Sequence, residues 1–153
     1  MKIALGSDHA GFEFKERLKG IIVSLGHSFE DFGTHTPDSC DYPDYAEPVA
    51  RAVATRKCGR GILICSTGIG MSMSANKVRG VRAALCCDLQ SARMSREHND
   101  SNVLCLGASE KEFERASEIV KVWLSTEFAG GRHENRVKKI TAIEERENRS
   151  PRK

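Results

Sequence analysis

The chain places a cysteine beside a glycine-rich turn, a combination that can support nucleophilic or acid-base chemistry. Cys65 closes an apolar run at 62–64 and precedes Ser66, Thr67, Gly68, Ile69 and Gly70. A turn of this kind that leads into a helix directs backbone N–H groups and the positive helix end toward one point. Such an environment favours a reactive thiolate. We therefore predict that Cys65 is catalytic and that the loop binds a phosphate or an oxyanion, although a plain tight turn has the same sequence.

The residues around this loop exclude several familiar chemistries. A cysteine phosphatase of the C-x5-R type needs an arginine where this chain has Met71. The Walker A lysine is absent, and Gly68-Ile69-Gly70 lacks the third glycine of a dinucleotide fingerprint because Met73 occupies that position. Neither ATP nor NAD is indicated, and we expect no cofactor. A thiolate can instead act as a general base that takes a proton from carbon while N–H groups hold the enediolate.

An aldose-ketose isomerase acting on a sugar phosphate also needs groups that open the ring and hold the phosphate. His9 and His98 are candidate acid-base groups because histidine titrates near neutral pH. Asp8 could orient a hydroxyl or His9, but it could equally cap a helix. Arg132 and Arg136 are spaced to lie on one helix face, where they could bind phosphate or simply be solvated. The remaining three histidines have weaker positional arguments.

Short apolar runs alternate with helical patterns along the chain, which predicts a doubly wound α/β fold. We expect five parallel strands at 2–5, 27–32, 61–65, 82–85 and 102–106. Helices are expected at 11–25, 44–55, 70–78, 88–97 and 110–127, with an added C-terminal helix at 134–147. Residues 1–147 would form one domain, and 148–153 a polar tail. In such folds the ligand lies beyond the carboxyl ends of the strands.

Composition narrows the classes of protein further. The 153 residues are 39% hydrophobic and 29% charged, which suits a single globular domain. The net charge is only +3. Residues 132–153 contain eight basic and four acidic side chains, whereas residues 1–131 contain sixteen basic and seventeen acidic ones. This balance argues against a nucleic-acid partner. No apolar run is long enough to span a membrane, and no secretory signal is evident, so we expect a cytoplasmic protein.

The six cysteines do not form a pattern typical of disulfides or zinc. They include no C-x-x-C pair, and the histidines do not group with them at ligand spacing, so we expect reduced thiols and no metal. Apart from Cys65, we predict that the cysteines are small buried apolar residues: Cys40, Cys58, Cys86, Cys87 and Cys105.

Several separated motifs together resemble the type B ribose-5-phosphate isomerases, a family that includes galactose-6-phosphate isomerase subunits and enzymes active on allose 6-phosphate. The resemblance covers about residues 2–147. The segments that carry it are Gly6-Ser7-Asp8-His9-Ala10-Gly11, Asp41-Tyr42-Pro43, residues 62–70, Glu97-His98-Asn99-Asp100, and Gly130-Gly131-Arg132-His133 with Arg136.

The resemblance implies a Rossmann-like three-layer α/β/α sandwich and a site shared between subunits of a homodimer or a dimer of dimers. It implies that Cys65 moves the proton between C1 and C2, and that His98, assisted by Thr67, opens the furanose. The substrate-contacting positions it implies are Asp8, His9, Tyr42, Ser66, Thr67, Gly68, Ile69, Gly70 and Asn99, with Arg132 and Arg136 on the phosphate. No metal is implied, and the substrates would be the ribose and ribulose 5-phosphates of the pentose phosphate pathway.

This sequence departs from some relatives in three places. Ser66 stands where many members have glycine, and Ser109 stands where some carry an arginine. Some relatives use a glutamate base further along the loop, where this chain has Ser74-Ala75-Asn76. The alternatives to a ribose-5-phosphate isomerase are the same chemistry on a hexose 6-phosphate and a non-catalytic sugar-phosphate sensor.

Overall fold

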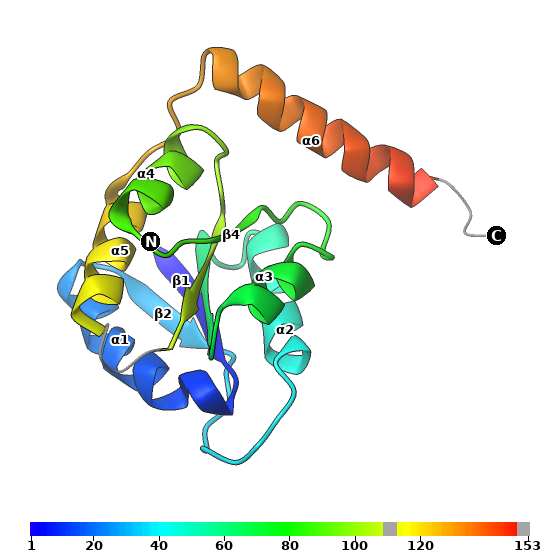
Figure 1. Cartoon of the computed structure of the whole chain (residues 1–153). Helices are drawn as coiled ribbons and strands as arrows, with labels where there is room; N and C mark the ends of the chain where they lie inside the picture. The colour runs from blue at the N-terminus through cyan, green and yellow to red at the C-terminus, as the bar shows by residue number, and fades with distance from the viewer. Residues whose placement is uncertain (109–112, 150–153) are drawn as a thin grey trace.

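The computed structural model describes residues 1–108 and 113–149, and within that part of the chain it contains an all-parallel sheet of five strands (Figure 1). The strands are β1 (Lys2–Ser7), β2 (Ser28–Asp31), β3 (Arg60–Cys65), β4 (Ala83–Leu85) and β5 (Val103–Gly107). The helices are the 3-10 turn η1 (His9–Gly11), α1 (Phe12–Ser24), α2 (Pro43–Ala54), α3 (Ile69–Ala75), α4 (Leu89–Glu97), α5 (Phe113–Ser125) and α6 (Arg132–Arg149). The predicted fold class is confirmed.

The strands lie in the order β2-β1-β3-β5-β4, so the sheet extends in opposite directions from the β1–β3 pair. In open parallel sheets a crevice forms at the carboxyl ends of the strands where the order reverses. Residues 8–11 follow β1, and residues 66–70 follow β3, its hydrogen-bonded neighbour. The topology therefore brings the two polar loops predicted to bind ligand to the same edge.

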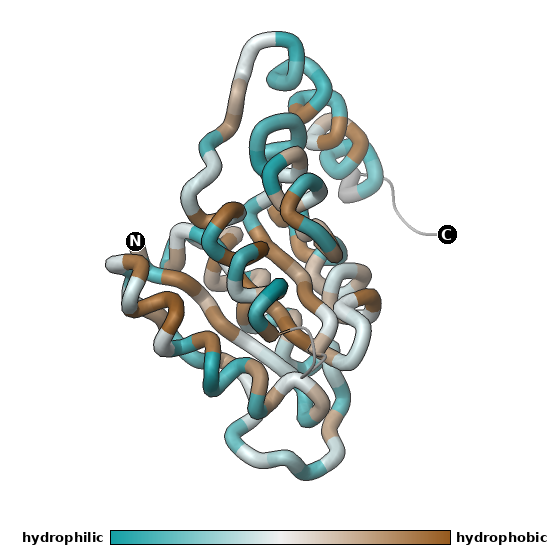
Figure 2. The backbone as a smooth tube through the Cα atoms, turned by 60° about the vertical axis from the view of Figure 1, so that its left-hand side comes forward, coloured by the Kyte–Doolittle hydropathy of each residue, from teal (hydrophilic) through white to brown (hydrophobic). Residues whose placement is uncertain are grey.

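The sheet is covered on both faces, as its continuous apolar strands require. All six residues of β3 are buried. Ile62 and Ile64 pack in the core beneath α1, α4 and α5, while Leu63 and Cys65 pack in the core beneath α2 and α3. Figure 2 shows that hydrophobic segments concentrate in the sheet and the helices that cover it, whereas α6 is largely hydrophilic.

Two helix boundaries differ from the prediction for identifiable reasons. The third helix was expected to reach residue 78, but α3 ends at Ala75. The Asn76 side chain donates to the Ser72 carbonyl and bonds both backbone groups of Ala83, which turns the chain toward β4. The last helix begins at Arg132, earlier than expected, because His133 N–H already bonds the Gly130 carbonyl.

The other observed elements agree with the predicted ones apart from their ends. The first predicted helix begins as the 3-10 turn η1, and the predicted start of the fifth helix at 110 lies outside the described residues. The predicted tail starts at 148, but α6 continues to Arg149; residues 150–153 lie outside the described part.

Helix α6 extends away from the sheet and its covering helices (Figure 1). Its contact with the body includes a hydrogen bond from the Gly80 N–H to Glu144 Oε1, at 2.9 Å. Ile140 and Ile143 on this helix are 44% and 53% exposed. None of the described helices is both long enough and apolar enough to cross a bilayer.

Candidate active site

Cys65 is the last residue of β3 and lies at the carboxyl edge of the sheet. It is only 5% exposed, and its Sγ accepts the Gly68 N–H at 3.1 Å. Its carbonyl accepts the Ala108 N–H at 2.8 Å, which ties the end of β3 to the segment that follows β5. A backbone donor thus points at the sulfur and stabilises negative charge that develops there.

The loop after Cys65 depends on two glycines. Gly68 has a φ of +75°, and a Cβ on it would lie 2.8 Å from the Leu106 carbonyl carbon. A Cβ on Gly70 would lie 2.6 Å from the Tyr42 ring, so this ring packs directly against the loop. Tyr42 is 41% exposed and immediately precedes α2. The structure therefore brings Tyr42 to the predicted site.

Ser66 and Thr67 are exposed between these glycines and Cys65. The Thr67 Oγ1 accepts the Ile69 N–H at 3.3 Å, so this hydroxyl closes the turn at the start of α3. A cavity of about 200 Å³ borders Ser66 and Thr67 and also touches Cys87 and Arg115. The loop is thus open to ligands on its solvent side.

Asp8 lies at the neighbouring strand end and has the capping role that its sequence position left open. Its Oδ1 accepts the Gly11 N–H at 3.0 Å, and its own N–H bonds the Ile64 carbonyl at 3.3 Å. The residue is 6% exposed. Because Ile64 directly precedes Cys65, Asp8 is tied to the strand that carries the thiol.

His9 has one ring nitrogen fixed by the backbone. The His9 Nδ1 lies 3.1 Å from the Cys40 backbone nitrogen and 3.2 Å from the Cys40 carbonyl oxygen, so the loop around Cys40 occupies this side of the ring. His9 also lines a cavity of about 150 Å³ together with Arg17, Pro37 and Ala108. The Nε2 side of this imidazole is therefore left for a ligand at the same edge as Cys65.

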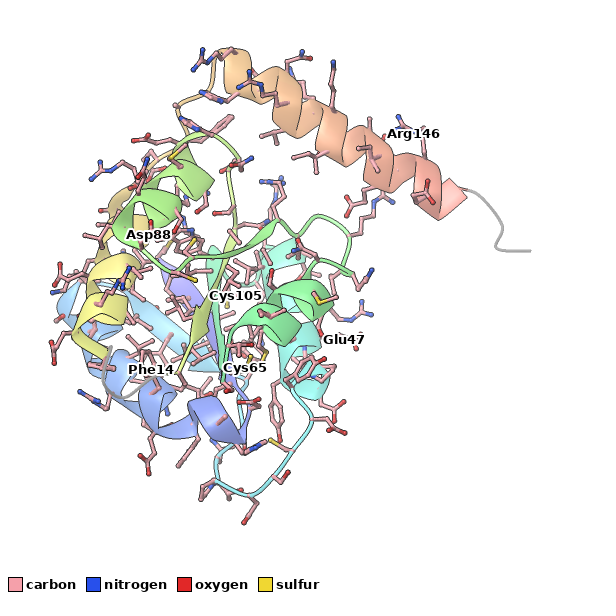
Figure 3. All side chains as sticks on the ribbon, viewed as in Figure 1. Phe14, Glu47, Cys65, Asp88, Cys105 and Arg146 are labelled. Carbon is pink, nitrogen blue, oxygen red and sulfur yellow. The ribbon has the colours of Figure 1, made fainter. Side chains whose placement is uncertain are left out.

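His98 lies at the opposite edge of the sheet from Cys65. It follows α4 and shortly precedes β5, whose first residue, Val103, pairs with Gly61. Cys65 pairs with Gly107 at the other end of the same strand, about 13 Å away at roughly 3.3 Å per residue. Figure 3 shows Cys65 at the end of the body remote from α6, which carries Arg146. One chain therefore does not bring His98 and Cys65 together.

A second cluster of predicted site residues surrounds His98. Its ring stacks on that of His133, with centroids 4.1 Å apart and planes within 6°. The Arg136 Nη1 lies 3.4 Å from His133 Nδ1, and Arg132 begins the same helix; both arginines are exposed. The position of His133 in the sequence only weakly indicated that it belongs to the site. The signal that could have identified it is its place between Arg132 and Arg136.

Ion pairs and backbone bonds hold this second cluster in place. Asp100, at a φ of +47°, accepts from Arg96 and Arg82 at 2.9 Å each, which fixes the turn after His98. The Ala129 N–H bonds the Glu97 carbonyl at 3.1 Å and so anchors the segment leading to α6.

Asn99, the other polar residue predicted in this turn, is exposed. Its carbonyl accepts from Arg82 Nε at 3.2 Å, so its backbone is held while its side chain faces solvent. Ser109, where some relatives carry an arginine, lies outside the described residues.

The six cysteines are all unpaired, but they do not share one environment. Cys58, Cys86 and Cys105 are buried as predicted, and burial raises the pKa of each thiol. The prediction was wrong for Cys87, which is exposed, and for Cys40, which is partly exposed. Cys86 turns its side chain into the core, so its neighbour Cys87 faces outward, and Cys40 lies in the surface loop that contacts His9.

The fold and the carboxyl edge together define an open parallel α/β protein in which a thiol lies against a glycine-rich loop that directs a backbone N–H at its sulfur. Residues 3–140 match the model of the Ribose/Galactose Isomerase family. The chain belongs to this family.

The similarity to individual members extends over nearly the whole chain. Ribose-5-phosphate isomerase B of Escherichia coli K12 is 48% identical over 147 residues, which are 96% of this chain and 99% of that protein. D-erythrulose-4-phosphate isomerase of Pectobacterium atrosepticum is 40% identical, over 96% and 97% of the two chains. The structure of Clostridium thermocellum ribose-5-phosphate isomerase B superposes with a TM-score of 0.93 at 50% identity, covering 96% of this chain and 99% of that chain.

Proposed function

We propose that this protein interconverts D-ribose 5-phosphate and D-ribulose 5-phosphate, with Cys65 as the general base. The observation that carries the proposal is the Gly68 N–H pointing at the Cys65 sulfur in a loop open to solvent. Relatives named as ribose-5-phosphate isomerase B match over almost the full length, which supports the pentose phosphate as substrate.

The isomerisation is a proton transfer between two carbons. The Cys65 thiolate takes the proton from C2 of the open-chain aldose, the electron pair forms the C1=C2 bond, and the C1 carbonyl becomes the oxygen of a cis-enediolate. The O2 proton then passes to O1, the C2 carbonyl forms as the C1=C2 bond breaks, and C1 takes the proton from the Cys65 thiol. Backbone N–H groups of residues 66–70 stabilise the enediolate oxygen. Each step moves only protons, so this mechanism uses no redox cofactor.

A complete site of this kind needs two copies of the chain. Cys65 and His9 lie at the carboxyl edge, whereas His98, Arg132 and Arg136 lie at the opposite edge. A symmetric dimer presents the same surfaces from both subunits. We infer that His98 and the two arginines of one copy face Cys65 of the other, where His98 opens the furanose and the arginines hold the phosphate.

The main alternative is the same reaction on a sugar phosphate with a different number of carbon atoms. The family name includes galactose, and one relative is named for a four-carbon ketose phosphate. The test is kcat/KM of the purified protein for D-ribose 5-phosphate, D-allose 6-phosphate, D-galactose 6-phosphate and D-erythrulose 4-phosphate. The proposal requires the highest value for ribose 5-phosphate. A clear preference for another sugar contradicts the substrate, and binding without turnover of any of them would favour a sensor.

A further inference from the structure

His98 and His133 form a closely stacked pair that joins α4 to α6. Their ring centroids are 4.1 Å apart and the ring planes differ by 6°, so the two imidazoles lie face to face. His133 is 8% exposed, and its N–H bonds the Gly130 carbonyl in the turn before α6. The His98 N–H bonds the Met94 carbonyl at 2.9 Å. Both backbones are therefore fixed, and the rings have little room to turn independently.

The environment of His133 keeps its ring neutral. The Arg136 Nη1 lies 3.4 Å from His133 Nδ1, and because a guanidinium can only donate, Nδ1 presents its lone pair there. Burial lowers the pKa of His133, and the nearby His98, Arg132 and Arg136 lower it further, while Glu97 opposes them weakly. At neutral pH the ring under His98 therefore carries its proton on Nε2 and no charge.

We propose that His133 is a positioning residue, whose ring holds the plane of the His98 imidazole by stacking. This inference rests on the proposed function, in which His98 opens the furanose. Opening breaks the C1–O4 bond, forms the C1 carbonyl and moves a proton from O1 to O4. An imidazole that relays this proton must face the ring oxygen edge-on.

The reverse reaction, from ribulose 5-phosphate, is a control that separates ring opening from the proton transfer between carbons. D-ribulose 5-phosphate cannot close a furanose ring, because the C5 oxygen that would close it carries the phosphate. Turnover from ribulose 5-phosphate starts with the proton transfer between carbons. The aldose that it forms is released in its open-chain form and closes its ring in solution, so this direction bypasses the ring step at His98. A residue that acts through His98 affects kcat for ribose 5-phosphate more than kcat for ribulose 5-phosphate, whereas a residue needed only for folding affects both alike.

Two variants that fill the same buried space separate stacking from simple packing. His133→Phe keeps a flat ring under His98, and His133→Leu replaces it with an aliphatic group. We expect His133→Leu to lower kcat for ribose 5-phosphate by about 3- to 10-fold, the value of an aromatic pair, with KM changed less than about twofold. Turnover of ribulose 5-phosphate stays near the wild-type value, and His133→Phe restores most of the loss.

The measurement is kcat and KM in both directions for both variants and for His98→Asn, with thermal unfolding as the check on folding. Equal losses in both directions for His133→Leu, no loss at all, or a His133→Phe variant as impaired as His133→Leu would each overturn the positioning role. If His98→Asn itself lacks the difference between directions, ring opening by His98 is wrong, and the inference about His133 fails with it.

Discussion

Cys65 and His98 stand at opposite edges of one sheet: Cys65 closes β3 opposite Gly107, and His98 precedes β5 at the edge where that strand starts. The first four residues of the strand between these edges are buried. No side-chain rotation in one chain can join the thiol to the imidazole. The proposed isomerase site therefore joins the carboxyl edge of one copy to the α4–α6 junction of another.

Removing the Cys65 thiol tests the proton-transfer step. Cys65→Ala should lower kcat for ribose 5-phosphate by about 1,000-fold, within the range for loss of a general acid-base group. Binding of the substrate, followed by calorimetry, should persist because the loop donors and the phosphate site remain. Cys87→Ala is the matched control, since Cys87 is an exposed thiol at the same edge, and it should keep wild-type turnover. Near-normal turnover in Cys65→Ala would refute the base assignment.

The arginines of α6 are expected to act on substrate binding. Arg132→Ala or Arg136→Ala removes a charge-assisted contact to phosphate, and we expect KM to rise about 10- to 100-fold with a smaller change in kcat. Lys139→Ala removes an exposed charge from the same helix and serves as the control. A similar KM increase for Lys139→Ala would show that general charge, and not a specific phosphate site, explains the effect.

The backbone of the Cys65 loop can be tested with a pair of glycine variants. Gly68 and Gly80 both have positive φ, at +75° and +82°, so alanine costs about 1 to 2 kcal/mol of backbone strain at either position. At Gly68 the new Cβ also meets Leu85 at 2.6 Å and the Leu106 backbone, whereas at Gly80 no atom of residues 1–108 or 113–149 lies within 4 Å. Gly68→Ala should be the less stable variant in urea unfolding and should lose activity, and Gly80→Ala should stay active. Equal activity in the two variants would argue against a functional loop.

A buried ion pair predicts how stability depends on pH. Asp31 Oδ2 lies 2.5 Å from Lys15 Nζ and 2.8 Å from Lys19 Nζ, and the Lys15 side chain is fully buried. Burial alone would raise the pKa of Asp31, but the hydrogen bonds from the lysines outweigh it and lower the pKa overall. The stabilisation is therefore present above the ordinary Asp pKa of about 3.9 and is lost as pH falls through the folded-state value.

Asp31→Asn should thus destabilise the protein by roughly 1 to 3 kcal/mol at pH 7, because the buried Lys15 then keeps only the half-exposed Glu16, at 2.7 Å, as its carboxylate partner. The difference from wild type should shrink in acid, which urea unfolding at pH 7 and at pH 3 would measure. Glu47→Gln, which removes an exposed pair with Arg51, should change stability little at either pH. A difference that stays constant with pH would contradict the ion-pair explanation.

The sequence predicted the sheet and the carboxyl-edge loops because both depend on local patterns. The apolar run ending at Cys65 and the glycines after it specify a buried strand and a tight turn, and the structure has both. The helix ends at Ala75 and Arg132 were missed because they depend on the Asn76 side chain reaching Ala83 and on the turn at Gly130.

The grouping of the site residues could be predicted only in part. His98 was recognised as a candidate, and its place before the predicted parallel strand at 102–106 agrees with the opposite edges that the pairing of β3 with β5 gives to His98 and Cys65. The stack of His98 on His133 joins two helices that are distant in sequence, and the bond between Ala129 and Glu97 lies beside it. Such contacts arise from tertiary packing and leave no periodic signal.

The most direct test of a site shared between two copies is complementation between inactive variants. Cys65→Ala and His98→Asn are unfolded together in equal amounts, refolded, and assayed with saturating ribose 5-phosphate. In a symmetric dimer, half of the refolded dimers pair the two variants, and each mixed dimer regains one intact site, so activity should reach about one quarter of wild type. Activity no greater than that of the two variants refolded separately would contradict the shared site.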